Sequence, residues 1–184
     1  MKTLWIENTG ERLTRLIPDS AVVSRGNPFF VPEEDAPWCA VPAIGIVIDR
    51  LGMKIAAKFA SRYYSKFIVV SHQRRADSAT PLEWMRDGAL VAGKPFETDA
   101  PTLSIRISDP NGVATADLDT AALREAFDAA IAHVSELVTL KSGDIIVLDP
   151  SLTAMPEPAA HILTHPQNLI INTNGEEALK VKFR

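Results

Sequence analysis

Histidine and cysteine, which often act as metal ligands and nucleophiles, are few in this 184-residue chain, and the histidines are spread along it. Its histidines are His72, His133, His161 and His165. His161 and His165 stand four residues apart, a spacing that would align two metal ligands on one helix face. Pro166 disfavours helical geometry at His165, and no third ligand is close in sequence, so loop histidines are the favoured interpretation. His133 falls on the polar side of a helical pattern and is expected at the surface.

The chain has one cysteine, Cys39, which excludes an internal disulfide and fits a reducing compartment. Its neighbours are apolar, and burial raises the pKa of a thiol, so we expect an inert side chain rather than a nucleophile. The acidic run 33–35 is expected to be a solvated turn, because consecutive side chains point in different directions. The chain contains no glycine-rich phosphate loop, no cysteine pair for zinc and no Gly-x-Ser-x-Gly motif.

The charge of the chain limits the kinds of partner that it is expected to bind. The formal net charge is −4 and the isoelectric point is about 5.6, which argues against broad nucleic-acid binding. The pair Arg74-Arg75 is expected in a solvated loop, with an anion clamp as the alternative. Residues 1–8 do not resemble a secretory signal, and no apolar run approaches the roughly 20 residues of a membrane helix. We therefore expect a cytoplasmic protein with no membrane partner.

The elements that must position these residues are mostly short strands, which predicts a strand-rich α+β domain. Asn174-Gly175 stands between two β-branched runs and is the strongest hairpin signal. A turn signal at 25–28 separates the second and third strands. The expected strands are 2–6, 21–23, 29–31, 43–48, 67–70, 103–108, 145–148, 169–172 and 179–183.

Two main helices are expected. In the first, 52–64, apolar residues recur every four positions and form one face, opposite a basic face of Lys54, Lys58 and Arg62. The second begins at Asp119 or Thr120, either of which can cap it. Its apolar face consists of Leu123, Phe127, Ile131, Val134 and Val138. Residues 71–101 are weakly periodic and are expected to be loops around a short helix near 81–86.

Several stretches, in a shared order, resemble the fumarylacetoacetate hydrolase family in its acylpyruvase and 2-hydroxyhepta-2,4-diene-1,7-dioate isomerase branch. They are PDSAVV (18–23) with NPFFVP (27–32), residues 50–64, GKPFE (93–97), TLKSGDII (139–146) and the closing hairpin. The resemblance covers most of residues 18–184 and leaves 1–17 as a short N-terminal segment of a single domain. It implies a mixed β-sandwich roll and a homodimer.

The resemblance also implies where a metal would bind. Family enzymes hold Mg²⁺ or Mn²⁺ with a Glu-x-Glu strand and one aspartate, since alternate residues of a strand share a face and hard cations prefer carboxylate oxygens. Counting from 50–52 and from 63–64 places these ligands at Val41, Ala43 and His72. The ligand types are therefore missing, and no metal cofactor is expected.

Other positions still match the family. Lys94 corresponds to a site lysine, with an exposed structural lysine as an equal alternative. Asp77 corresponds to the second acid of a family run that begins here at His72. Beside the same expected pocket stand Gln73, Arg74 and Arg75. With three acids lost, Arg74, Arg75 and Lys94 would make the pocket positive and suited to a small carboxylate or phosphate without a metal. The alternative is a degenerated pocket that binds nothing.

Two functions follow from these residues. The first is a non-catalytic protein that binds a small anion or acts in subunit interaction, including pairing with an active homologue. The alternative is a diverged hydrolase, decarboxylase or tautomerase acting on 2-oxo or 1,3-dicarbonyl acids. In that case Lys94, His72 and Asp77 supply the acid–base and anion-binding groups, with His72 titrating near neutral pH.

Overall fold

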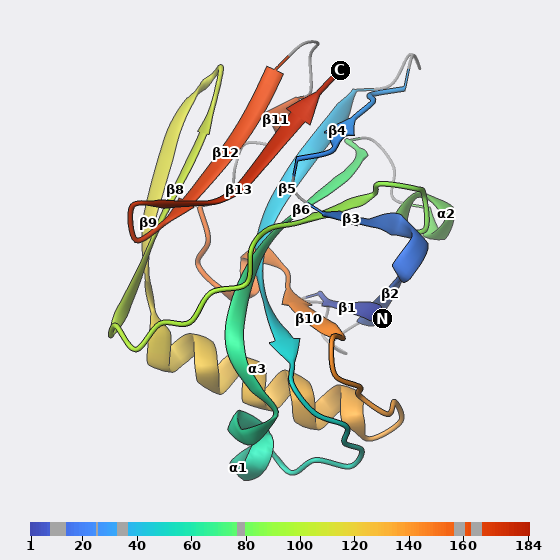
Figure 1. Cartoon of the computed structure of the whole chain (residues 1–184), viewed down its shortest axis with the longest axis vertical. Coiled ribbons are helices and arrows are strands. Elements are labelled where there is room, and N and C mark those ends of the chain that lie inside the picture. Colours follow the sequence, from blue (N-terminus) through green and yellow to red (C-terminus); the bar gives the residue numbers. More distant parts are fainter. Residues whose placement is uncertain (8–13, 25, 33–36, 77–79, 157–160, 163–166) are drawn as a thin grey trace.

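The fold is built from two β-sheets and one long helix (Figure 1). It was obtained as a computed structural model, and the structure describes residues 1–7, 14–24, 26–32, 37–76, 80–156, 161–162 and 167–184. The first sheet has the strand order β2-β1-β10-β5-β6-β7-β3, with β11 beside β5, and the second has the order β4-β13-β12-β8-β9. The predicted strand-rich α+β class is confirmed.

The elements have the following bounds. The first sheet consists of β1 (Lys2–Ile6), β2 (Thr14–Pro18), β3 (Val22–Ser24), β5 (Trp38–Ile48), β6 (Tyr64–Arg75), β7 (Leu90–Ala92), β10 (Ile145–Leu148) and β11 (His161–Ile162). The second consists of β4 (Pro28–Phe29), β8 (Thr102–Asp109), β9 (Gly112–Asp119), β12 (Gln167–Thr173) and β13 (Glu176–Phe183). The helices are α1 (Ala57–Ala60), α2 (Pro81–Trp84) and α3 (Thr120–Ser135), with 3₁₀ turns at Asp19–Ala21, Ser61–Tyr63 and Pro150–Leu152.

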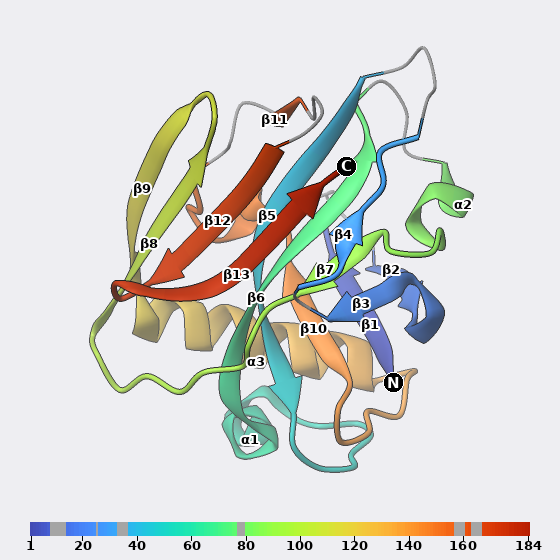
Figure 2. The same cartoon turned by 45° about the horizontal axis from the view of Figure 1, so that its top comes forward.

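The first sheet is curled into a roll (Figure 2). Its terminal strands β2 and β3 are joined only by the turn Asp19–Ala21, so the two ends of the strand order must lie close together. Alternate residues along each strand therefore face either the inside or the outside of the roll. The inner core contains Trp5, Ile17, Ala21, Ala43, Ile68, Val70, Trp84, Ala89, Leu90, Ile145 and Val147.

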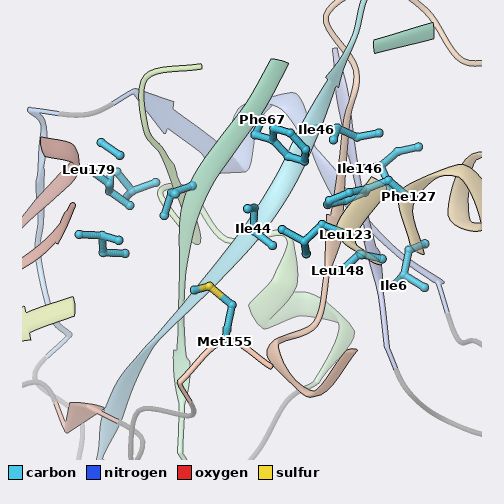
Figure 3. Close-up of a cluster of buried hydrophobic side chains, with 14 of the residues drawn as sticks. Ile6, Ile44, Ile46, Phe67, Leu123, Phe127, Ile146, Leu148, Met155 and Leu179 are labelled. Atoms are coloured by element: carbon cyan, nitrogen blue, oxygen red, sulfur yellow. The ribbon is translucent and has the colours of Figure 1, made fainter. Parts of the chain in front are cut away.

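The outer face of the roll packs against the second sheet and α3 in a larger core (Figure 3). Side chains from β5, β6 and β10 meet those of α3 there, including Ile44, Ile46, Phe67, Leu123, Phe127, Ile146 and Leu148. The carboxylate of Asp119 caps α3 by accepting from the N–H groups of Ala121 and Ala122 at 2.8 and 3.1 Å. The predicted second helix and its Asp119 cap are confirmed, but the helix ends at Ser135, before Val138.

The closing hairpin is also confirmed. Strands β12 and β13 pair antiparallel, and Asn174 and Gly175 both have positive φ, at 50° and 86°. Two consecutive residues of this kind form the turn that matches the twist of the flanking strands. The strand expected at 21–23 exists as β3, which pairs with β7. The strand expected at 29–31 is wrong in extent, because β4, which pairs with β13, ends at Phe29.

The helix expected over 52–64 is wrong in extent. Only α1 and the 3₁₀ turn Ser61–Tyr63 are helical there. Gly52 instead forms a bridge with Leu140, and the N–H of Lys54 donates to the carbonyl of Ser135 at 2.7 Å. The backbone groups of this segment are satisfied by the end of α3 and its following loop, so they do not form successive helical turns.

The loops expected over 71–101 are likewise wrong in part. β6 continues through Arg75, and β7 follows α2, which matches the short helix predicted near 81–86. β9 was not expected at all. β6 is buried on both faces and carries the polar residues Ser71, His72 and Gln73 in its interior, so it lacks the alternation by which a half-buried strand is identified.

An ion pair between partly exposed Lys2 and buried Asp144 joins the first strand to the turn before β10. The carboxylate of Asp144, which is 2% exposed, accepts from the backbone N–H groups of Lys2 and Lys141 at 3.0 and 2.8 Å. It also pairs with the Lys2 ammonium, which in turn donates to the carbonyl of Thr139 at 2.9 Å. Burial alone would raise the pKa of Asp144, but the hydrogen bonds from Lys2 and Lys141 outweigh it and lower this pKa.

We predict that Asp144→Asn lowers the free energy of unfolding at pH 7 by about 1–3 kcal/mol, because the partly buried Lys2 ammonium and two backbone N–H groups lose their charged acceptor. Since the pKa of Asp144 is lower in the folded state, its contribution is present above the unfolded pKa, near 3.9, and is lost as pH falls below it. Urea unfolding at pH 7 and pH 3 measures both effects. The exposed Asp117→Asn variant is the control, and equal stability of the two variants would contradict the assignment.

Candidate functional site

The three positions assigned to lost metal ligands lie together. In the β5–β6 register Val41 stands opposite His72, and Ala43 stands opposite Val70. Directly opposed residues of an antiparallel pair share a face of the sheet, so Val41, Ala43 and His72 share one. Ala43 and Val70 belong to the inner core, which makes this the inner face of the roll. Three carboxylates at these positions would be placed to meet one cation.

In this chain an aromatic cluster of Trp5, His72 and Trp84 occupies that face. The His72 ring stacks on Trp84 with the centroids 4.1 Å apart, and Trp5 lies 5.5 Å from His72 and 5.6 Å from Trp84. All three side chains are at most 2% exposed. Side chains from β1 and α2 therefore fill the space beside Val41 and His72.

Local contacts hold the two tryptophans in place. α2 begins with a capping box in which Thr80 and Glu83 exchange hydrogen bonds, and this fixes the turn that carries Trp84. The Arg15 guanidinium lies 5.0 Å from the centre of the Trp84 ring and donates to the Glu7 carboxylate at 2.7 Å. Nε1 of Trp5 donates to Asp149 at 3.2 Å.

His72 is neutral at physiological pH. Burial, followed by the positive charges of Arg74 and Arg15, lowers the pKa of His72 to about 3. The expectation that His72 titrates near neutral pH is therefore wrong. Its Nδ1 and Nε2 atoms have no hydrogen-bond partner among the residues that the structure describes. An imidazole this reluctant to accept a proton is a weak general base.

Two further polar groups of the inner face share this condition. Within the described parts of the chain, Nε1 of Trp84 and Oγ1 of Thr3 are buried without a hydrogen-bond partner. Thr3 pairs with Ile17 and Ile145 of the inner core, which places it on the same face. Native proteins rarely leave buried polar groups unpaired, so a group of them on one face requires an explanation. Neutral His72, Trp84 and Thr3 can each donate one hydrogen bond, which suits a ligand that carries acceptors.

The predicted cationic residues are only partly brought together. Arg74 stands opposite Cys39 on the inner face of the roll, which also carries His72. Gln73 and Arg75 lie on the outer face of the same sheet. The pair Arg74-Arg75 therefore ends a strand rather than lying in the expected loop. Burial raises the pKa of Cys39, against the opposing effect of Arg74, which is consistent with the expected inert thiol. Nε of Arg75 lies 3.8 Å from the Glu83 carboxylate.

Lys94 lies apart from the aromatic cluster. It follows Leu90, the β7 residue that pairs with His72, by four positions, or roughly 13 Å of extended chain. Its side chain is exposed, and its N–H donates to the carbonyl of Ala178 in β13 at 3.0 Å. A Cβ at Gly93 would come within 2.6 Å of the Ala178 oxygen, so glycine is needed where β7 passes between the sheets. Asp77 lies outside the described residues.

The other candidate ligands are not gathered into a site. His161 pairs with Ala40 through the backbone of β11, and His165 and the acidic run 33–35 lie outside the described residues. His133 is exposed on α3, as expected. Within the described ranges no three His, Cys, Asp or Glu side chains come together as metal ligands. No described helix has the length and apolar character needed to cross a membrane.

Comparison with known proteins identifies the fold. No family model and no curated protein sequence matches the chain. Among solved structures, a maleylpyruvate hydrolase from Sphingobium sp. SYK-6 in complex with manganese(II) and pyruvate is 16% identical, with 99% of this chain and 69% of that chain covered and a TM-score of 0.81. A 2-hydroxyhepta-2,4-diene-1,7-dioate isomerase from Mycobacterium marinum is 18% identical, with 99% and 73% covered and a TM-score of 0.78.

A fumarylacetoacetate hydrolase family structure from Yersinia pestis CO92 is 13% identical, with 100% of this chain and 92% of that chain covered and a TM-score of 0.78. This chain therefore has the fold of fumarylacetoacetate hydrolase family hydrolases and isomerases. The resemblance that the sequence predicts is confirmed at this level. Arg15, Trp5, Trp84 and Thr3 were missed as residues of the candidate site, because no family motif contains them.

We predict a pH dependence of stability that originates in His72. Its pKa is lower in the folded state than in the unfolded state, so its contribution is complete above pH 6.5 and is lost as pH falls toward 3. The loss approaches about 1.4 kcal/mol per pH unit. In His72→Phe, which keeps a ring stacked on Trp84, urea unfolding between pH 6.5 and 4.5 should show a clearly smaller slope.

The matched control for this slope is the exposed histidine of α3. His133→Gln should leave the slope of the wild type unchanged, because His133 is solvated in both states. A wild-type slope that survives His72→Phe would show that His72 is not the buried neutral group described above.

Proposed function

We propose that this chain is a diverged member of the fumarylacetoacetate hydrolase family that binds a small carboxylate inside its roll without a metal and does not catalyse the family's reactions. The observation that carries the proposal is the His72–Trp84 stack at the position of the third metal ligand. A hard divalent cation requires several oxygen ligands, and Val41 and Ala43 supply none. The residues present therefore do not fit Mg²⁺ or Mn²⁺.

The unpaired groups of the inner face support binding of a carboxylate. His72, Trp84 and Thr3 offer hydrogen-bond donors that have no partner among the described residues. Arg15 and Arg74 make the potential there positive, as their effect on the pKa of His72 indicates. A carboxylate would accept these hydrogen bonds in a region of low dielectric constant, where each is stronger than in water. Because the aromatic cluster is buried, Trp84 must move for a ligand to enter.

Titration calorimetry with pyruvate and with oxaloacetate in the presence of EDTA tests the proposal. We expect binding that the chelator does not change. Trp84→Phe, which keeps the stack but removes its N–H, should weaken binding roughly tenfold, the equivalent of one buried hydrogen bond. Trp38→Phe is the matched control, since Nε1 of Trp38 is also buried and unpartnered among described residues but lies in the outer core. Binding that requires Mn²⁺ would contradict the proposal.

The compared structures favour a second candidate, because they are described as hydrolases and isomerases. In that case the chain is a diverged hydrolase, decarboxylase or tautomerase acting on 2-oxo or 1,3-dicarbonyl acids, with Lys94, His72 and Asp77 as its functional groups. Turnover of an acylpyruvate and oxaloacetate panel should then be abolished by Lys94→Ala and preserved in the exposed-lysine control Lys66→Ala. An inactive wild type would exclude this candidate for the panel tested.

The proposed assembly and location follow the family resemblance and the sequence. They are a homodimer or a complex with an active homologue, in the cytoplasm. In the second arrangement this chain would act as a regulatory subunit, and co-purification from its native host would detect the complex.

A further inference from the structure

One end of the molecule exposes several large apolar side chains. The connection from β5 to α1 projects there beside the end of α3 (Figure 1). Ten large apolar side chains are exposed among the described residues, and four of them lie in this region. They are Leu51 at 69%, Met53 at 49%, Phe59 at 42% and Leu137 at 88% exposure. We name this region, residues 49–66 with Leu137, the basic tip.

Cations surround these apolar side chains. The exposed basic residues of the tip are Arg50, Lys54, Lys58, Arg62 and Lys66. Asp49 within the segment and Glu136 beside Leu137 are the exposed acids of the same region. The tip is thus strongly positive on a chain whose net charge is −4. The Nζ of Lys58 and the guanidinium of Arg62 lie 5.0 and 4.9 Å from the centre of the Phe59 ring, which holds two charges at an apolar residue.

The tip is held in a defined conformation. Gly52 and Leu140 exchange two backbone hydrogen bonds, of 3.0 and 2.8 Å. Lys54 has a left-handed backbone, with φ of 53°, and its N–H donates to the carbonyl of Ser135. The N–H of Ile55 donates to the Ser135 hydroxyl at 2.9 Å. A strained lysine backbone at an exposed loop persists only where its surroundings enforce it, so the surface is preformed.

We infer that the basic tip docks on an anionic lipid surface. Exposed aliphatic side chains can enter the headgroup region while the surrounding cations attract acidic lipids. An acidic peptide helix is disfavoured because it binds by laying its apolar face into a hydrophobic groove, whereas this segment projects from the end of the molecule (Figure 1). Nucleic acid is disfavoured because three of the four exposed apolar side chains of the tip, Leu51, Met53 and Leu137, are not aromatic and cannot stack on bases. Such peripheral binding departs from the expectation of no membrane partner, which rested on the lack of a spanning segment.

Co-sedimentation with vesicles of 70% phosphatidylcholine and 30% phosphatidylglycerol tests this inference at low salt. The full chain should bind these vesicles and not pure phosphatidylcholine. Lys58→Glu with Arg62→Glu should reduce the partition coefficient roughly 25-fold or more, since each cation near an anionic surface contributes roughly a factor of five. Leu51→Ser with Met53→Ser should reduce it roughly tenfold, with little change in the salt dependence.

Matched controls carry the same changes on other surfaces. The control Arg106→Glu with Lys180→Glu makes the same change of charge on the second sheet. The control Phe30→Ser with Val113→Ser removes two exposed apolar side chains, one directly after β4 and one in β9. Both controls should bind as the wild type does. The inference is overturned if the wild type does not sediment with anionic vesicles, if a control loses as much binding as its matched variant, or if the chain binds heparin but not vesicles.

Discussion

The curl of the first sheet is the constraint on which the rest of the structure depends. The turn Asp19–Ala21 brings β2 and β3 together and so gives a single sheet an inside and an outside. The outside is committed to the main core with α3 and the second sheet. The inside holds the smaller core, and the residue types that line it decide whether it is a site or only a second core.

In this chain the inside of the roll is mostly a second hydrophobic core that also contains a few polar side chains. Val41 and Ala43 line it as apolar residues, and His72 stays uncharged because its environment disfavours a proton. The polar atoms that remain unpaired among the described residues there reduce stability relative to apolar replacements of the same shape. Stability alone would favour removing them. The same atoms are the donors on which the proposed carboxylate site rests.

Much of the fold is predictable from local sequence. The apolar stripe and the Asp119 cap predict the long helix α3, and Asn174-Gly175 predicts the final hairpin. Residues 52–64 also have helical periodicity, but their hydrogen bonds go to Ser135 and Leu140, which no local pattern can reveal. The extension of β6 through buried polar residues escapes detection for the same reason, because its partners are supplied by β5 and β7.

The site is less predictable than the fold. Positions 41, 43 and 72 can be located by counting from family motifs, and the register confirms that they lie on one face. The sequence does not predict that Trp5 and Trp84 cover these positions. The two tryptophans come from segments far apart in the sequence and meet only when the sheet curls. Lys94 and Arg75 match expected site positions in sequence, yet Arg75 lies on the opposite face of β6 from His72, and Lys94 lies four residues beyond the β7 residue that pairs with His72.

The central claim is that side chains, and not a cation, occupy the inner face beside Val41 and His72. A crystal grown with Mn²⁺ and pyruvate and measured at the manganese absorption edge tests it directly. We predict no anomalous peak within the roll. Trp84 should lie over His72, or be displaced only by a carboxylate hydrogen-bonded to the inner-face donors. A manganese peak beside Val41, Ala43 and His72 would contradict this claim.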